Sequence, residues 1–85
     1  MIIVFHKDFK KNFKRLTPKI QEKLEERLRL FRADEFNSAL NNHSLKGKYL
    51  EYRSINVTGD LRAIFHRKAK EAVFVAIDSH SNLYG

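Results

Sequence analysis

Apolar residues recur at helical spacing over the first part of the chain, and a Thr-Pro step divides them into two runs. Phe9, Phe13 and Leu16 lie four and three residues apart. The second run has the same spacing and consists of Ile20, Leu24, Leu28 and Phe31. Thr17 can cap a helix and Pro18 suits its first position, so a second helix is expected to begin there. Two helices joined by so short a turn should form an antiparallel hairpin.

Strand-like segments surround these helices. Met1 to Phe5 is a run of bulky residues that predicts a first strand. From Arg32 to Ser44 the periodicity disappears, and Asp, Asn and Ser indicate a connection. Three further strands are predicted, Tyr49 to Val57, Leu61 to Arg67 and Ala72 to Asp78. The order β-α-α-β-β-β predicts an α+β fold: two N-terminal helices pack on a small, mainly antiparallel four-stranded sheet, with the first strand at an edge.

Length and charge limit the classes of function. The 85 residues suit a single domain, and 17 basic against 10 acidic side chains give a net charge of +7. This surplus favours a polyanionic partner such as nucleic acid, although it is also typical of a merely solubilising surface. The absence of cysteine excludes disulfides and thiolate zinc sites. The longest apolar run, Ala72 to Ile77, is too short to span a membrane, so we expect a cytoplasmic protein without a membrane partner.

The stretch from Asn42 to Phe65, together with the last seven residues, holds the side chains that can handle phosphate and protons. If Ile55 and Val57 face the helices, strand alternation places Ser54 and Asn56 on the opposite, partly open face of the sheet. The polar groups of this stretch are then expected to converge with the histidine at the end of the last strand.

These residues also carry a resemblance to a known family. The segment HSLKGKYLEYRSINVTGDLRAIF, the ending SHSNLYG and the order of elements resemble the RelE-type toxins of bacterial toxin-antitoxin pairs, most closely the YafQ-like branch. The most specific parts are His43 to Gly47, the pair Tyr52-Arg53, Asp60 and the terminal His80 to Gly85. The resemblance covers essentially the whole chain. It implies a toxin that cuts mRNA without a metal ion, usually in the ribosomal A site, and that an acidic antitoxin silences.

The resemblance implies catalytic residues as well. Positions that match catalytic ones of the YafQ-like branch are His43, Asp60, His80 and Tyr84. Arg62 matches an arginine that RelE uses on the phosphate. Two positions depart from the pattern, because Asn56 stands where a second histidine is expected and Ser54 where an acidic residue is expected. Asparagine cannot exchange a proton near neutral pH, so one acid-base or charge-stabilising role is vacant or reassigned.

The chemistry can be argued from the residues themselves. Cleaving RNA with its own 2′-hydroxyl needs a base, an acid for the leaving 5′-oxygen and positive charge on the phosphorane. A histidine with a pKa near ~6.5 suits either proton transfer. His80 is the first candidate, with a cap on the last strand as the alternative, and His43 is either catalytic or a structural loop residue. Asp60 either orients a histidine or closes a turn. Tyr84 either stacks a splayed base or packs on the core.

Basic side chains are the predicted RNA contacts. Arg62 and Lys46 are candidates for the phosphate, with a solvated rim as the alternative for Lys46. The basic first helix suits ribosomal RNA of the 16S region or an acidic segment of an antitoxin, although such a charge run is usually a solvated face. The predicted RNA-binding residues are Lys10, Lys11, Lys14, Arg15, Lys46, Lys48, Arg53 and Asn56. His6 and His66 are assigned surface or structural roles. The histidines lack metal-ligand spacing, so neither a metal site nor another cofactor is expected.

The predicted function is therefore that of a single-domain toxin, residues 1–85, of a type II toxin-antitoxin system. It is expected to cleave mRNA, to leave a 2′,3′-cyclic phosphate, and to bind an acidic antitoxin, mRNA and the ribosome, meeting DNA only through the antitoxin complex. Two other classes stay open. One is a ParE-like toxin that acts on DNA gyrase. The presence of His80 and Tyr84 argues against this class. An RNA-binding module without catalysis is compatible with Asn56.

Overall fold

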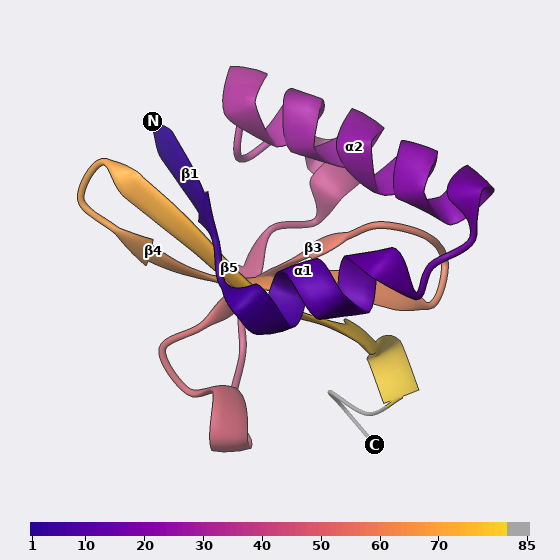
Figure 1. Cartoon of the computed structure of the whole chain (residues 1–85). Helices are drawn as coiled ribbons and strands as arrows, with labels where there is room; N and C mark the ends of the chain where they lie inside the picture. The colour runs from indigo at the N-terminus through magenta and orange to yellow at the C-terminus, as the bar shows by residue number, and fades with distance from the viewer. Residues whose placement is uncertain (82–85) are drawn as a thin grey trace.

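Figure 1 shows the computed structural model of the chain, which describes residues 1–81. The elements along the chain are β1 (Ile2–Phe5), α1 (Lys7–Lys14), α2 (Pro18–Ala33), η1 (Ser38–Leu40), β2 (His43–Ser44), η2 (Gly47–Tyr49), β3 (Arg53–Asn56), β4 (Leu61–Lys68) and β5 (Glu71–Ser79). The strands form one sheet in the order β1-β5-β4-β3-β2. β1 is parallel to β5 and every other pair is antiparallel. The α+β class and the edge position of the first strand are confirmed.

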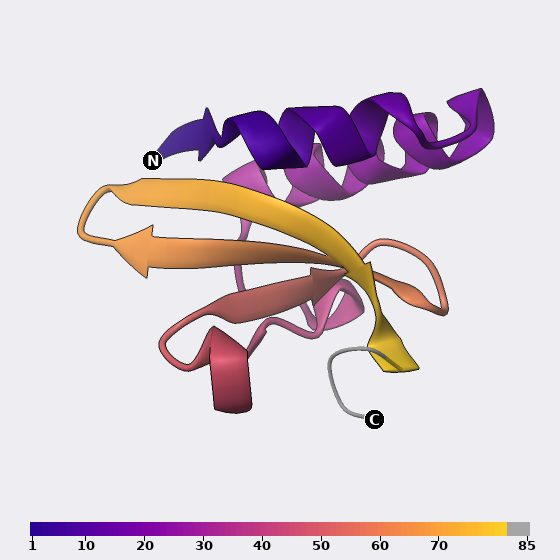
Figure 2. The same ribbon diagram turned by 60° about the horizontal axis from the view of Figure 1, so that its bottom comes forward.

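The two helices begin at residues whose side chains cap them. The hydroxyl oxygen of Thr17 accepts a hydrogen bond from the backbone N–H of Ile20 at 3.3 Å, and Pro18 takes the first position of α2, as predicted. The imidazole Nδ1 of His6 accepts from the N–H of Asp8 at 3.1 Å, which gives His6 a structural role at the start of α1. Figure 2 shows both helices on one side of the sheet, so this side is where the apolar core forms.

Three phenylalanines form the centre of the core between α2 and the sheet. Phe31, Phe65 and Phe74 are fully buried. The ring of Phe65 lies 5.0 Å from those of Phe31 and Phe74, which are 5.4 Å from each other. Burial of each such side chain stabilises the fold by about 1.5–3 kcal/mol. Ile55 and Val57 join this core, so Ser54 and Asn56 point to the other face, as strand alternation predicted.

The predicted count of four strands is wrong by one. His43 and Ser44 belong to the predicted connection, but in the structure they form the short strand β2 beside β3. His43 lies opposite Ser54, and Ser44 lies opposite Arg53. A strand of two residues has no alternation to detect, so only the tertiary pairing defines it.

The predicted strand from Tyr49 to Val57 is also too long, because β3 begins only at Arg53 and ends at Asn56. The chain turns through η2 instead, with a positive φ of 66° at Gly47 and 75° at Glu51. The N–H of Tyr52 donates to the carbonyl of Tyr49 at 2.9 Å, so this donor is satisfied within the turn and does not pair across the sheet.

The face opposite the helices is less open than predicted. Ser54 is fully buried, and so is Ile64, which lies opposite it on β4. Figure 1 shows η2 below the sheet, on the side away from α2. The middle of the face is therefore covered, and its polar side chains lie in a sheltered setting.

Candidate active site

A row of polar residues crosses the sheet on the face opposite the helices. Asn56 of β3 lies opposite Arg62 of β4, which in turn lies opposite Asp78 of β5. Directly opposed residues share one face, with Cβ atoms about 4.5–5.5 Å apart. Asp78 is not among the site residues predicted from the sequence. The signal was available, because Asp78 follows Ile77, which packs against the core, and alternation then turns Asp78 to the polar face.

The end of β5 brings His80 to the turn between β3 and β4. The backbone N–H of His80 donates to the carbonyl oxygen of Asp60 at 2.6 Å. Both residues are exposed. The structure thus joins two of the predicted catalytic residues, one from a hairpin turn and one from the last strand.

The turn that carries Asp60 is fixed from two sides. The hydroxyl oxygen of Thr58 accepts from the N–H of Asp60 at 3.3 Å and of Leu61 at 3.0 Å. Nη1 of Arg62 donates to three carbonyl oxygens of the turn, at 3.0 Å, 3.3 Å and 3.1 Å for Thr58, Gly59 and Leu61. Arg62 is only 8% exposed. Nη1 therefore holds the turn, and the guanidinium gives the polar row a permanent positive charge.

Three polar atoms on this face are buried without a hydrogen-bond partner among residues 1–81. They are Oγ of Ser54, Oδ1 of Asn56 and Nε of Arg62. A buried polar atom left unpaired costs about 1–3 kcal/mol. Such a concentration on neighbouring strands is typical of a functional site rather than of a region selected for stability alone.

His43 lies on the far side of this row, on β2. Its Nδ1 is 2.7 Å from the carbonyl oxygen of Asn41, which can only accept, so Nδ1 carries the proton. Nε2 is then the basic nitrogen of the neutral ring. Three strand spacings separate β2 from β5, which places the backbone of His43 roughly 14 Å from that of Ala76, the β5 residue level with it through Ser54 and Ile64. His43 and His80 thus lie on opposite sides of the polar row.

The remaining predicted residues near the sheet lie apart from this row. The guanidinium Nε of Arg53 donates to Oδ1 of Asn42 at 2.8 Å, and its carbon lies 5.7 Å from the centre of the Phe36 ring. Arg53 shares the parity of Ile55, so alternation already placed it on the helix side. Lys46 and Lys48 are exposed around η2. Tyr84 lies outside the described residues.

Comparison with known proteins identifies the family. The model of the YafQ bacterial toxins of type II toxin-antitoxin systems matches residues 1–85. The chain belongs to this family. A comparison with curated protein sequences returned no significant match.

Solved structures share the fold of this YafQ-family toxin. YafQ from E. coli strain BL21(DE3) has a TM-score of 0.79 at 21% identity, covering 98% of this chain and 97% of that one. A YoeB/ParE toxin from Agrobacterium tumefaciens has a TM-score of 0.76 at 18% identity, covering 94% and 99%. The E. coli DinJ-YafQ toxin-antitoxin complex matches with a TM-score of 0.76 at 22% identity, covering 98% and 96%. The predicted relationship to RelE-type toxins of the YafQ branch is confirmed.

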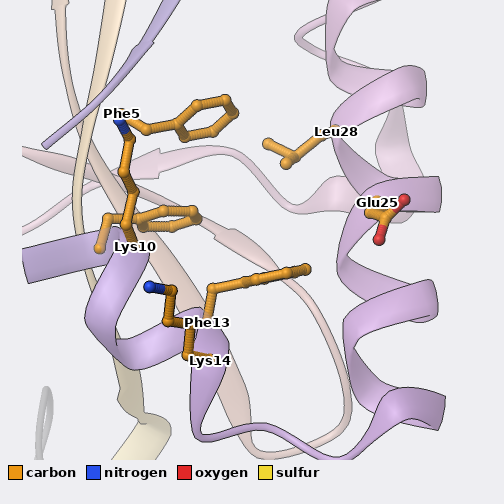
Figure 3. A pocket seen from close by; sticks show the side chains of 7 residues that line it. Phe5, Lys10, Phe13, Lys14, Glu25 and Leu28 are labelled. Carbon is orange, nitrogen blue, oxygen red and sulfur yellow. The ribbon is translucent and has the colours of Figure 1, made fainter. Parts of the chain in front are cut away.

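A second surface of the YafQ-family toxin is the groove between α1 and α2, shown in Figure 3. Its volume is about 410 Å³, and its apolar lining consists of Phe5, Phe9, Phe13 and Leu28. Lys10 and Lys14 of α1 and Glu25 of α2 complete it. Lys11 and Arg15, the other two basic residues predicted to bind RNA from α1, are exposed outside this lining. The basic helix therefore presents cations to two surroundings, one apolar and one open to solvent.

Within residues 1–81, the His, Asp and Glu side chains form no group of three that could hold a metal ion. No helix in this part of the chain is long and apolar enough to cross a membrane.

Proposed function

We propose that this YafQ-family toxin is an endoribonuclease that cleaves mRNA on the ribosome without a metal ion and thereby inhibits translation. The observation that carries the proposal is the hydrogen bond that holds His80 beside Asp60, with His43 on the other side of the polar row. Two groups able to transfer protons thus lie on either side of a buried positive charge. This is the arrangement that cleavage by a 2′-hydroxyl needs.

The proposed reaction follows from the two imidazoles. Nε2 of His43 takes the proton of the 2′-hydroxyl, whose oxygen attacks the adjacent phosphorus. The bond from phosphorus to the 5′-oxygen breaks, and protonated His80 donates a proton to that oxygen. The products are a 2′,3′-cyclic phosphate and a free 5′-hydroxyl. Asp60 orients His80, and Arg62 contributes positive charge as the phosphorane forms, while Lys46 binds RNA away from the row, beside η2.

Mapping RNA ends after expression without an antitoxin tests this proposal. We expect protein synthesis to stop and new 5′ ends to arise within translated mRNA. The upstream fragments should carry a cyclic phosphate, and EDTA should not inhibit cleavage by the purified toxin on programmed ribosomes. DNA cleavage at gyrase sites with intact mRNA would instead establish a ParE-like activity. RNA that is bound but never cut would establish a non-catalytic module.

We further propose that an acidic antitoxin covers the basic side of α1 and occupies the groove between α1 and α2. An E. coli relative has been solved as a complex of YafQ with DinJ. The apolar lining suits the apolar side of a helix, and Lys10 and Lys14 suit its acidic residues. Charge reversal of both lysines should weaken binding of the neighbouring gene product. The same reversal at Lys19 and Lys23 of α2 is the matched control, and equal loss from both pairs would contradict this placement.

A further inference from the structure

The loop from Leu45 to Tyr52, named the aromatic loop for Tyr49 and Tyr52, leaves the sheet and returns to it at nearly the same point. Its neck is fixed by the N–H of Leu45, which donates to the carbonyl of Tyr52 at 2.9 Å. Inside the loop, the N–H of Leu50 donates to the carbonyl of Gly47 at 3.0 Å. Glu51 adopts a φ of 75°, which is unfavourable for a residue other than glycine. Backbone strain of this kind persists where the surroundings impose it, and it concentrates at functional sites.

Three aromatic rings connect this loop to the sheet. The ring centres of Tyr49 and Tyr52 are 6.1 Å apart, and those of Tyr52 and His66 are 5.5 Å apart, with edge-to-face geometry in both pairs. None of the three residues is fully buried. Tyr52 lies between the other two rings, so Tyr49 is the outer member. Nζ of Lys48 lies 5.2 Å from the centre of the Tyr49 ring.

The aromatic loop is on the same side of the sheet as the polar row. Tyr52 precedes Arg53, which faces the helices, and His66 follows the core residue Phe65, so alternation turns both rings to the opposite face. Asn56 is four residue steps from Tyr52, which corresponds to roughly 13 Å along an extended strand. A single strand of RNA whose scissile phosphate lies over the row can therefore reach the loop along the same face.

We propose that the aromatic loop is an RNA subsite in which Tyr49 stacks on a nucleobase beside the cleaved nucleotide and Lys48 binds the adjoining phosphate. This inference rests on the proposed nuclease function and extends it to a flanking nucleotide. The combination of a partly exposed ring with a neighbouring cation is how proteins bind single strands with little base preference. The net charge of the loop is positive, as binding of RNA requires, since Lys46 and Lys48 outnumber Glu51.

Leu50 distinguishes this occupant from a protein partner. It is 66% exposed in the same loop, and a protein docking on the loop would bury it. RNA that stacks on Tyr49 does not need it. Substitution of the two neighbouring residues therefore separates the two kinds of ligand.

Fluorescence anisotropy with a short labelled oligoadenylate tests the subsite, in the His80→Ala background so that the RNA stays intact. Loss of one stacking interaction corresponds to about 1–3 kcal/mol. Tyr49→Leu should therefore weaken binding by about 5- to 150-fold, whereas Tyr49→Phe, which keeps the ring, should bind within about twofold of the parent. With an RNA of abasic nucleotides, the parent and the Tyr49→Leu variant should bind with equal affinity. Lys48→Gln should lower the salt slope of binding by about 0.7.

Leu50→Gln is the matched control and should leave RNA binding unchanged. The inference is overturned if Tyr49→Leu binds oligoadenylate as tightly as the parent, or if abasic RNA shows the same loss, which would indicate a structural role for the ring. Loss of antitoxin binding in both Tyr49→Leu and Leu50→Gln, with unchanged RNA binding, would establish a protein contact instead. Tyr49-dependent binding by a parent toxin that cuts no mRNA would overturn the nuclease proposal alone.

Discussion

The two faces of the sheet differ in what their buried side chains achieve. On the helix side, Phe31, Phe65 and Phe74 pack ring against ring and contain no polar atom to satisfy. On the other side, Ser54 is fully buried and Arg62 nearly so, but both keep polar atoms without hydrogen-bond partners among residues 1–81. The first face stabilises the fold. The second face carries a free-energy cost, because these buried polar atoms have no hydrogen-bond partner within residues 1–81.

The two faces of the same sheet therefore have different roles, one in stability and the other in function. Substitutions on the helix side should change how much toxin is folded, whereas substitutions on the polar side should change what the folded toxin does.

Replacing His80 should have the largest effect on activity. His80→Ala removes a proton donor and should lower the cleavage rate by about 10²- to 10⁴-fold. Because His80 is exposed, the thermal midpoint should stay within a degree or so of the parent. His6→Asn is the matched control, since asparagine can still cap α1 and His6 lies outside the site. Single-turnover kinetics on programmed ribosomes provide the measurement, and a parental rate for His80→Ala would disprove the acid-base role.

Phe74→Ala should have the largest effect on stability. Phe74 is fully buried, with its ring 5.0 Å from Phe65 and 5.6 Å from Phe9. The substitution should lower the free energy of unfolding by about 3–5 kcal/mol, measured by denaturant titration. The half-buried Val73 next to it gives the comparison, because Val73→Ala should cost only about 1 kcal/mol. Similar losses for the two variants would show that the helix side does not dominate stability.

Arg62 should affect both properties, because it lies on the polar face and fixes a turn. Arg62→Lys keeps the charge but loses Nη1, which donates to three turn carbonyls, so stability should fall by roughly 1–3 kcal/mol and the rate by about tenfold. Thr58→Val releases the same turn without changing charge. If positioning of Asp60 is the cause, it should also slow cleavage, and the double variant should lose less than the sum. A parental rate for Thr58→Val would instead favour a direct phosphate contact.

Much of this fold could be predicted because its signals are local. Helical periodicity and a Thr-Pro step gave the helix hairpin, and apolar runs gave the long strands. The turn at Lys46 to Lys48 was predictable from its glycine, but β2 and the continuation of the turn to Tyr52 were not, because a two-residue strand has no period and the second positive φ falls on Glu51 rather than on glycine. For the candidate site, motif resemblance indicated the residues, but the partners of Arg62 depend on tertiary contacts. Parity of alternation places Arg53 on the helix side of the sheet and Asp78 in the polar row.

At Asn56, a substitution is expected to raise the cleavage rate rather than to lower it. Asn56→His restores the imidazole that the YafQ-like pattern has here, next to Arg62 in the row. An added proton-transfer group should raise the cleavage rate, by about tenfold if geometry is only partly favourable. Asn56→Gln, which adds length without a titratable group, should not raise it. An unchanged rate for Asn56→His in a folded protein would mean that the role has been reassigned to another residue.

The smallest effect is expected outside both faces, on the solvent side of α1. Lys11 and Arg15 are exposed and do not line the groove, so replacing both with glutamine should leave core, groove and polar row intact. Removal of one cation that binds a phosphate should reduce the salt slope of ribosome binding by about one, and weaken affinity roughly threefold at low salt. Lys19 and Arg29, exposed on α2, provide a control pair with the same change of charge. Because the bound complex retains His80 and His43, the rate at saturating ribosome concentration should not change. A slope that falls equally for both pairs would show that net charge alone attracts the ribosome, and α1 would then have no specific part in binding.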